Sequence, residues 1–295
     1  MAAICTTVPF PTRPALLHFG SDGQAQRIVA EEVAVALAYQ GTSHAVMMAS
    51  PDALEDFAIG FSLTEGIIRH RSEIDDLAVI VQPHGIVLRM TLVAARQAAL
   101  QQRRRRLAGP VGCGLCGLES LDEALRAVPR LSSAAMLPAA EIPRALLALS
   151  GGQSLHRLTR SMHAAGFWQP GRGLLEMRED VGRHNALDKL GGALARRDLD
   201  PATGAILLTS RVSVELVQKA AMLGVPLLIA ASAPTALAIG TAEACGLTLV
   251  GTARGEAFEV FTHPERILGL ADRAPAPFHP PRIAAAGLPL GQGCR

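Results

Sequence analysis

Two cysteines, Cys113 and Cys116, stand two residues apart between glycines in the segment 112–117. Glycine weakens regular structure and lets the backbone turn sharply, so we expect the pair on a loop. Four arginines at 103–106 precede it, and an amphipathic helix pattern follows at 118–125. A positive field and a nearby helix N-terminus both lower the pKa of a thiol and favour the thiolate. The pattern therefore predicts chemically reactive thiols.

Metal sites explain the pair poorly. Structural zinc needs four ligands, usually from two close pairs, and the chain has neither a second C-x-x-C nor an H-x-x-x-H. A zinc deaminase carries H-x-E followed by P-C-x-x-C. Here Gly112 replaces the proline, and the only H-x-E, at 263–265, comes after the cysteines. We therefore expect no resident metal.

Other uses of the pair stay open. The glycines of 112–117 match the dinucleotide pattern G-x-G-x-x-G, but no buried strand precedes them. A thioredoxin-like C-x-x-C should open a helix directly after a strand of a βαβ unit, which the basic run does not favour. A carrier of sulfur as a persulfide needs an exposed cysteine of low pKa, with a second one nearby to protect or release the sulfur. Two inert loop cysteines are the plain alternative.

Composition excludes several classes of protein. The 295 residues carry a net charge of +2 and only 3% aromatic residues, which argues against a nucleic-acid binder. Five cysteines, an odd number, do not form a secreted disulfide framework. The chain shows no signal-peptide pattern, and its apolar runs are too short to span a membrane. We expect a cytoplasmic protein. Its basic residues are nearly all arginine, since Lys189 and Lys219 are the only lysines.

The N-terminal part predicts a small α+β domain. Alternating apolar residues over 27–39 are typical of a strand, and 45–48 of a return strand. Ser50 is a good cap for a helix that begins near Pro51 and ends at Gly66. The apolar runs 77–81 and 86–92 flank a turn and predict a hairpin, and 94–106 predicts a helix.

The C-terminal part predicts an α/β domain. Short apolar strands alternate with helices from residue 141 onward, which indicates a mainly parallel sheet covered on both faces, hence three layers. The predicted organisation is a flexible N-terminal arm at 1–26, an α+β domain at 27–107, a cysteine-motif loop with a connecting helix at 108–140, the α/β domain at 141–270, and a disordered Pro/Ala/Gly-rich tail at 271–295.

Polar residues follow several predicted strands of this domain. Ligands of open parallel sheets bind beyond the carboxyl ends of the strands, where helix N-termini attract phosphate. Asp180 is placed to cap the helix that follows it. The candidate ligand contacts are Arg183, His184 and Asn185 after one strand, Thr209, Ser210 and Arg211 after the next, and Ser232 after a third. Thr262 and His263 end the last strand and face either the same edge or solvent. Capped helices with solvated polar turns are the alternative.

Taken together, these motifs resemble the FdhD family of formate dehydrogenase accessory sulfurtransferases. The resemblance runs from about residue 31 to 267 and rests on motifs in the same order as in the family. They are Pro51–Phe61 with Glu65-Gly66, the cysteine motif 112–117, Arg178–Ala186, Thr209–Arg211, and Arg254-Gly255 with 258–262. Two departures are Arg160-Ser161 where relatives have two glycines, and Phe261 where many have tyrosine.

The resemblance implies a cytoplasmic homodimer with a cytidine-deaminase-like C-terminal domain. It implies sulfur transfer from a cysteine desulfurase to the molybdenum bis-molybdopterin guanine dinucleotide cofactor that formate dehydrogenase needs. That cofactor would be bound as a client, and no permanent cofactor is expected. The persulfide carrier maps to Cys113, with Cys116 as auxiliary, and the cofactor contact maps to Phe258, Glu259, Val260, Phe261, Thr262 and His263. A non-catalytic molybdenum-cofactor-binding chaperone is the alternative function.

Overall fold

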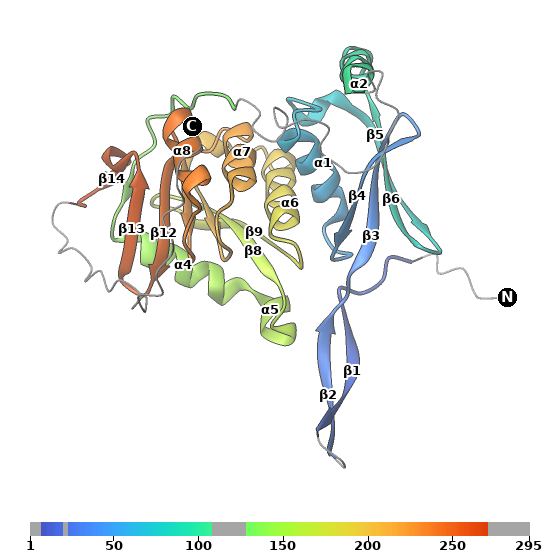
Figure 1. Cartoon of the computed structure of the whole chain (residues 1–295), viewed down its shortest axis with the longest axis horizontal. Helices are drawn as coiled ribbons and strands as arrows, with labels where there is room; N and C mark the ends of the chain where they lie inside the picture. Colours follow the sequence, from blue (N-terminus) through green and yellow to red (C-terminus); the bar gives the residue numbers. More distant parts are fainter. Residues whose placement is uncertain (1–6, 20–22, 108–127, 271–295) are drawn as a thin grey trace, which may run out of the picture.

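The computed structural model describes residues 7–19, 23–107 and 128–270. Two sheets lie side by side and are joined through two helices that pack against each other between them, α1 (Leu54–Thr64) and α6 (Arg183–Arg196) (Figure 1). Cys113 and Cys116 lie outside the described residues, as does the predicted tail at 271–295. Among the helices that the structure describes, none is both long enough and apolar enough to cross a membrane.

The N-terminal sheet has four strands in the order β4-β3-β6-β5. Its strands are β3 (Val33–Tyr39), β4 (Thr42–Ala49), β5 (Ile74–Gln82) and β6 (Gly85–Leu92). The predicted hairpin is confirmed, because β5 and β6 pair antiparallel on either side of a short turn. The predicted helix at 94–106 is confirmed as α2 (Ala94–Leu107), and a short 3-10 turn, η1 (Arg71–Glu73), precedes β5. Alternate strand residues such as Val35, Leu37 and Leu88 pack against Phe57 of α1 and form the core of this domain.

Strands β1 (Thr12–Phe19) and β2 (Gly23–Ala30) form an antiparallel ribbon, which projects away from both sheets (Figure 1). Residues 1–26, predicted as a flexible arm, contain β1 and the start of β2. The single strand predicted over 27–39 was wrong, because its two halves belong to β2 and β3 in different sheets. The break lies at Glu31 and Glu32, where charged residues interrupt the apolar alternation.

The C-terminal sheet has six strands in the order β13-β12-β11-β10-β8-β9. Its strands are β8 (His163–Gln169), β9 (Gly173–Asp180), β10 (Ala205–Leu208), β11 (Leu227–Ala230), β12 (Thr248–Arg254) and β13 (Ala257–Thr262). Only the pairings of β11 with β10 and with β12 are parallel. The other three pairings are antiparallel, so the prediction of a mainly parallel sheet was wrong and the sheet is mixed.

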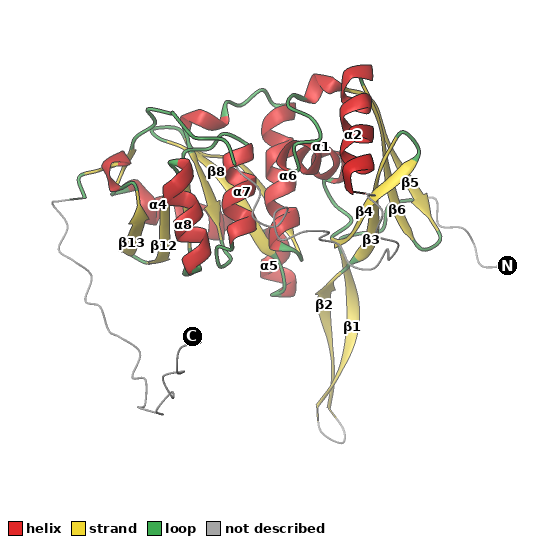
Figure 2. Cartoon of the chain, turned by 45° about the horizontal axis from the view of Figure 1, so that its top comes forward, coloured by secondary structure: helices red, strands yellow, loops and turns green. Residues whose placement is uncertain are grey.

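Helices cover both faces of this sheet, so the α/β class with three layers is confirmed. One face packs against α6, α7 (Val214–Met222) and α8 (Ala236–Cys245), which lie in a row in Figure 2. The other face packs against α4 (Glu141–Gly152), which is followed by the short α5 (Ser154–Thr159). Adjacent residues of one strand serve opposite layers: Leu207 packs with α4, and Leu208 with the row of three helices.

Four small elements complete the described fold. A two-stranded parallel pair, β7 (Leu137–Pro138) with β14 (Ile267–Leu268), joins the start of the C-terminal domain to its end. Two 3-10 turns, η2 (Pro201–Thr203) and η3 (Pro264–Arg266), stand before β10 and after β13.

Candidate functional site

One edge of the six-stranded sheet collects most of the polar residues that the sequence singled out. Strands β9, β10, β11 and β12 all point the same way and end at this edge, which we call the rim. The antiparallel strand β8 begins there with His163, which pairs with Asp180 at the end of β9. The segments 183–185 and 209–211 and residue 232 follow these strand ends directly. The sequence therefore located one common edge correctly from strand order alone.

The first turn of α6 carries Arg183 and His184 at the rim. Gly182 is the N-cap of this helix, and no side chain caps it, so backbone N–H groups of the first turn are not used by a capping side chain. His184 Nε2 lies 2.9 Å from Glu215 Oε2 and 3.5 Å from Ser213 Oγ. Burial lowers the pKa of His184, and the cations of Arg183 and Lys219 add to this, outweighing the opposite effect of Glu215. This turn can offer an anion a guanidinium and N–H groups.

His163 is the second rim histidine. Burial lowers its pKa, and the positive charges of Arg183 and His156 add to the effect. Both rim histidines therefore favour the neutral form at pH 7. Arg183 and Arg211 have no ion-pair partner among the carboxylates of the described residues. The fixed positive charge at this edge thus comes from arginines that are available to a ligand.

The hydroxyl groups at the strand ends are partly engaged in the fold. Thr209 Oγ1 accepts a hydrogen bond from the Ala164 N–H at 2.9 Å and so joins the end of β10 to β8. Ser210 is buried and donates to the carbonyl of Arg211 at 3.0 Å. Ser232 is half-buried, and its carbonyl accepts from the Thr252 N–H at 3.2 Å. Thr209 and Ser210 therefore shape the rim, and Arg211 is exposed on it.

Asn185 turns away from the rim into the contact between the domains. Its side chain is buried, and Nδ2 donates to the Met48 carbonyl at 2.8 Å and to Asp180 Oδ1 at 3.0 Å. Both amide hydrogens are thereby committed to the protein itself. Asn185 belongs to the same turn as Arg183 and His184, but its amide nitrogen makes hydrogen bonds within the protein.

Strand β13 holds residues 258–262 of the predicted segment, and His263 follows it. The strand runs from the rim to the opposite end of the sheet. Because β13 runs antiparallel to β12, its first residues lie at the rim, whereas Thr262 pairs with Leu249 at the opposite edge. Thr262 Oγ1 is buried, donates to the Leu247 carbonyl at 2.6 Å and accepts from the Leu249 N–H. His263 Nε2 lies 3.0 Å from the Glu243 carbonyl. Thr262 and His263 therefore do not share the rim.

The remaining members of this segment divide between the two faces of the sheet. Phe258 and Val260 pack on the α4 side, and Phe261 packs on the side of α8. Glu259 is exposed and accepts a hydrogen bond from Thr252 Oγ1 at 2.8 Å. A ligand at the rim would meet the Phe258 end of the strand.

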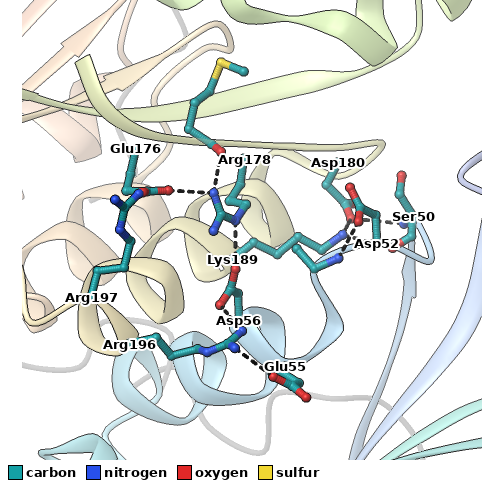
Figure 3. Close-up of polar contacts among 12 residues, drawn as sticks. Ser50, Asp52, Glu55, Asp56, Glu176, Arg178, Asp180, Lys189, Arg196 and Arg197 are labelled. Atoms are coloured by element: carbon teal, nitrogen blue, oxygen red, sulfur yellow. Dashed lines mark hydrogen bonds and ion pairs between the residues drawn. The ribbon is translucent and has the colours of Figure 1, made fainter. Parts of the chain in front are cut away.

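Sequence reasoning missed a set of buried charges between the two domains. Ser50 and Asp180, predicted as helix caps, lie there instead: the Ser50 N–H donates to Asp180 Oδ2 at 3.0 Å. Helix α1 begins without a side-chain cap, after Ala53 in a left-handed conformation (φ 48°). Arg178 bridges Asp56 of α1 and Glu176 of β9, at 2.8 and 2.7 Å (Figure 3).

The two lysines of the sequence could have indicated this interface, because both lie in it. Lys189 Nζ lies 2.6 Å from Asp180, and Lys219 Nζ lies 2.9 Å from Asp188. Burial lowers the pKa of Lys219, but Asp188 and Glu65 outweigh it and raise that pKa above its ordinary value. A chain that uses arginine elsewhere and has two lysines places both in the contact between its domains.

Cys245 is the one cysteine within the described residues. Its thiol is buried, and burial raises its pKa, so it is a poor nucleophile. No group of three or more His, Cys, Asp or Glu side chains in the described ranges is arranged to hold a metal ion.

Comparison with known proteins places this chain in a family. The FdhD/NarQ family profile matches residues 30–268, and the chain belongs to that family. A relative from Agrobacterium fabrum, named sulfur carrier protein FdhD, is 53% identical over 85% of this chain and 93% of its own length. One of the same name from Bordetella petrii is 48% identical over 84% of this chain and 89% of its own.

A solved structure supports the same assignment. The crystal structure of a proposed formate dehydrogenase accessory protein from Desulfotalea psychrophila matches with a TM-score of 0.69 and 28% identity. The match covers 87% of this chain and 98% of that protein. The likeness thus extends over both domains.

Proposed function

We propose that this protein is a sulfurtransferase that accepts sulfur from a cysteine desulfurase on Cys113 and passes it to the molybdenum cofactor of formate dehydrogenase. One observation carries the proposal: a C-x-x-C pair stands in a chain whose relatives are named sulfur carrier proteins. The name of the Desulfotalea protein supports formate dehydrogenase as the recipient. Cys113 and Cys116 lie outside the described residues, so their support comes from the sequence.

The first step is an exchange between sulfur atoms. The Cys113 thiolate attacks the terminal sulfur of the desulfurase persulfide, the sulfur–sulfur bond of the donor breaks, and the donor cysteine leaves as a thiolate. No oxidant is needed, because the sulfur moves at the same oxidation level. Cys116 is the auxiliary residue, which can displace the outer sulfur as hydrosulfide by forming a disulfide with Cys113. The unreactive surroundings of Cys245 support the choice of the pair.

The acceptor in this proposal is molybdenum bis-molybdopterin guanine dinucleotide, bound as a client. Its phosphate groups suit Arg183, Arg211 and the first turn of α6, since guanidinium and helix N-terminal N–H groups both bind phosphate well. His184, Thr209, Ser210 and Ser232 line the same rim. Within the segment implied by the family resemblance, Phe258 and Glu259 lie at the rim end, so we assign the contact to that end of β13 first.

We also propose an oligomeric state and a cellular location for this protein. The family resemblance supports a cytoplasmic homodimer that meets the desulfurase and formate dehydrogenase in turn. It also supports a cytidine-deaminase-like identity for the C-terminal domain, and the three-layer arrangement around the six-stranded sheet is compatible with that identity.

Intact-mass spectrometry tests the first step. After incubation with an active cysteine desulfurase and cysteine, the wild-type chain should gain one sulfur atom that a reductant removes and that maps to the peptide containing 113–116. Cys113→Ala should lose this gain, and Cys116→Ala should keep it. Cys245→Ala is the matched control and should behave as wild type. Full sulfur loading of Cys113→Ala would contradict the assignment.

The chaperone alternative predicts a different result in cells. If both cysteines matter little, the double variant Cys113→Ala/Cys116→Ala should still support active formate dehydrogenase in a strain that lacks the chromosomal copy. A sulfur carrier predicts loss of that activity with a normal amount of folded protein.

A further inference from the structure

Lys189 is a fully buried cation, at 0% exposure, in the contact between the two domains. A buried ammonium group is unfavourable unless it is paired and hydrogen-bonded. Its Nζ lies 2.6 Å from Asp180 Oδ2, donates to the Ser50 carbonyl at 2.9 Å, and stands 5.9 Å from the centre of the Phe57 ring. The amino group therefore joins three segments: the end of β9, the segment before α1, and α1 itself. Figure 3 shows Lys189 beside Asp180 and Ser50.

Asp180, the partner of Lys189, is saturated with donors. Besides Lys189, its Oδ2 accepts from the Ser50 N–H at 3.0 Å. Its Oδ1 accepts from the Gly182 N–H at 2.7 Å and from Asn185 Nδ2 at 3.0 Å. One buried carboxylate thus holds the turn at 180–182 and the first turn of α6, and Lys189 is its only ion-pair partner among the described residues.

The turn at 180–182 leads directly into the rim residues of α6. Gly182 is the N-cap of α6, and Arg183 and His184 follow it directly. The turn is packed closely, because a Cβ added at Gly182 would lie 2.8 Å from Asn185 Nδ2. The Asp180 carboxylate thus links Lys189 to the turn that carries Arg183 and His184.

The other lysine provides a natural comparison. Lys219 is also buried, and its Nζ contacts Asp188 at 2.9 Å, Thr64 at 3.0 Å and Glu65 at 3.0 Å. It likewise joins the two domains, but its contacts involve the end of α1 and a later turn of α6. Within the described residues Lys219 makes no hydrogen bond or ion pair with the turn at 180–185, and it acts on His184 only through its charge. Removal of either lysine thus breaks a buried ion pair that lies within the C-terminal domain, at its contact with the N-terminal one, and only Lys189 pairs with a carboxylate that bonds to the turn at 180–185.

We propose that Lys189 is a positioning residue of the rim: through Asp180 it sets the first turn of α6 so that Arg183 and His184 can receive phosphate. The choice of phosphate rests on the proposed function, whereas the control of the turn by Lys189 does not. Lys189 itself does not touch the ligand, since its amino group is closed off from solvent.

Hydrogen–deuterium exchange of the full chain tests the positioning directly. Lys189→Met should speed exchange in peptides that cover 180–187 by about tenfold or more, because the turn loses the ion pair that holds it. Lys219→Met, the matched control, should speed exchange at the end of α1, around 62–66, and leave 180–187 close to wild type. Unchanged exchange over 180–187 in Lys189→Met, or equal loosening by both variants, would overturn the proposal.

Titration calorimetry with inorganic pyrophosphate tests the link to the rim. The Kd should rise about tenfold in Lys189→Met, in which the turn is no longer held, and in Arg183→Ala, which removes a charged hydrogen-bond donor. It should rise less in Lys219→Met, because Lys219 makes no bond to the turn and acts on His184 only through its charge. If the wild type fails to bind pyrophosphate while Lys189→Met still loosens 180–187, the proposed phosphate dock is wrong and the positioning role stands. If the wild type binds and Lys189→Met binds equally well, the positioning role is wrong and the dock stands.

A second variant tests the positioning role in case Lys189→Met fails to fold. Lys189→Met/Asp180→Asn leaves no unpaired charge in the interface and preserves side-chain volume closely. It should fold and should still exchange faster at 180–187 than wild type, because the neutral amide cannot recover the charged bonds to the turn. Wild-type protection in this double variant would contradict the dependence of the turn on the ion pair.

Discussion

Single residues at the rim are tuned by burial and by neighbouring cations. The side chain of His184 is 25% exposed and lies beside Glu215, yet burial, Arg183 and Lys219 together lower its pKa. His163 is shifted in the same direction, first by burial and then by Arg183. The rim therefore presents arginine charge at neutral pH without charged histidines, and protonation would add positive charge only in acid.

The histidine shifts predict how stability depends on pH. The unfolded chain binds a proton at each histidine near pH 6.5, whereas the folded chain binds it only at lower pH. Between those values the unfolded state holds more protons, so the free energy of unfolding falls as pH decreases from about 7, by at most about 1.4 kcal/mol per pH unit for each site. Urea unfolding of wild type and of His163→Gln/His184→Gln measures this, and the double variant should show the flatter dependence.

An NMR titration of the histidine rings provides the control for that prediction. The His184 and His163 signals should show midpoints below 6.5. A midpoint at or above 6.5 for His184 would mean that Glu215 dominates its surroundings, against the lowered pKa.

Among the elements, α1 and α6 hold the molecule together. Helix α6 lies between the six-stranded sheet on one side and α1 on the other, so its residues are buried nearly all round (Figure 2). The two helices approach closely where each has a glycine. A Cβ added at Gly60 would lie 1.6 Å from the Asp188 carbonyl oxygen, and one added at Gly192 would lie 1.9 Å from that of Asp56. Backbone contacts backbone here, so a side chain cannot move aside to make room.

Alanine at these glycines should separate the helices. Gly60→Ala and Gly192→Ala should each destabilise the protein by at least about 1–3 kcal/mol, the usual effect of overpacking a rigid site. Gly240→Ala in α8 is the matched control, because nothing lies within 4 Å of its added Cβ. It should stabilise the protein by roughly 0.5–1 kcal/mol through helix propensity. Denaturant unfolding measures all three, and wild-type stability in both Gly60→Ala and Gly192→Ala would contradict the close packing.

At the scale of the whole molecule, the two domains behave as one unit. Their contact combines the glycine crossing with polar bonds from Lys189, Lys219 and Arg178 to the N-terminal domain. These bonds end on Ser50, Glu65 and Asp56, respectively. A contact of this kind couples the unfolding of both domains, because opening it would expose buried charged groups and break their bonds across the interface. The rim, which belongs to the C-terminal domain, is therefore held by the N-terminal one.

The single tyrosine and the single tryptophan allow this coupling to be measured. Tyr39 is buried in the N-terminal domain and Trp168 in the C-terminal one. Urea transitions followed by near-ultraviolet absorbance of Tyr39 and by fluorescence of Trp168 should coincide in wild type. Asp56→Ala, which removes the partner of Arg178 and Arg196, should move the midpoints apart. Separate transitions already in wild type would contradict the coupling.

The sequence by itself determined most of the elements after residue 40, the α/β class and the family. Apolar periodicity located the hairpin β5–β6, the helix α2 and the buried strands β10 and β11 within a few residues. These patterns are local, since each depends on residues a few positions apart. Strand order also brought Arg183, Thr209 and Ser232 to one edge of the sheet, because successive strands joined by helices end at the same side.

Only the tertiary structure decided what distant segments do to one another. The directions of β8 and β13 made the sheet mixed and separated Thr262 from the rim, and neither direction is encoded by apolar periodicity. Ser50 and Asp180 have the residue types of helix caps, yet they bond to each other across 130 positions. A capping pattern reports what a side chain can do locally, whereas a buried charge is satisfied by whichever donors the packed fold brings to it.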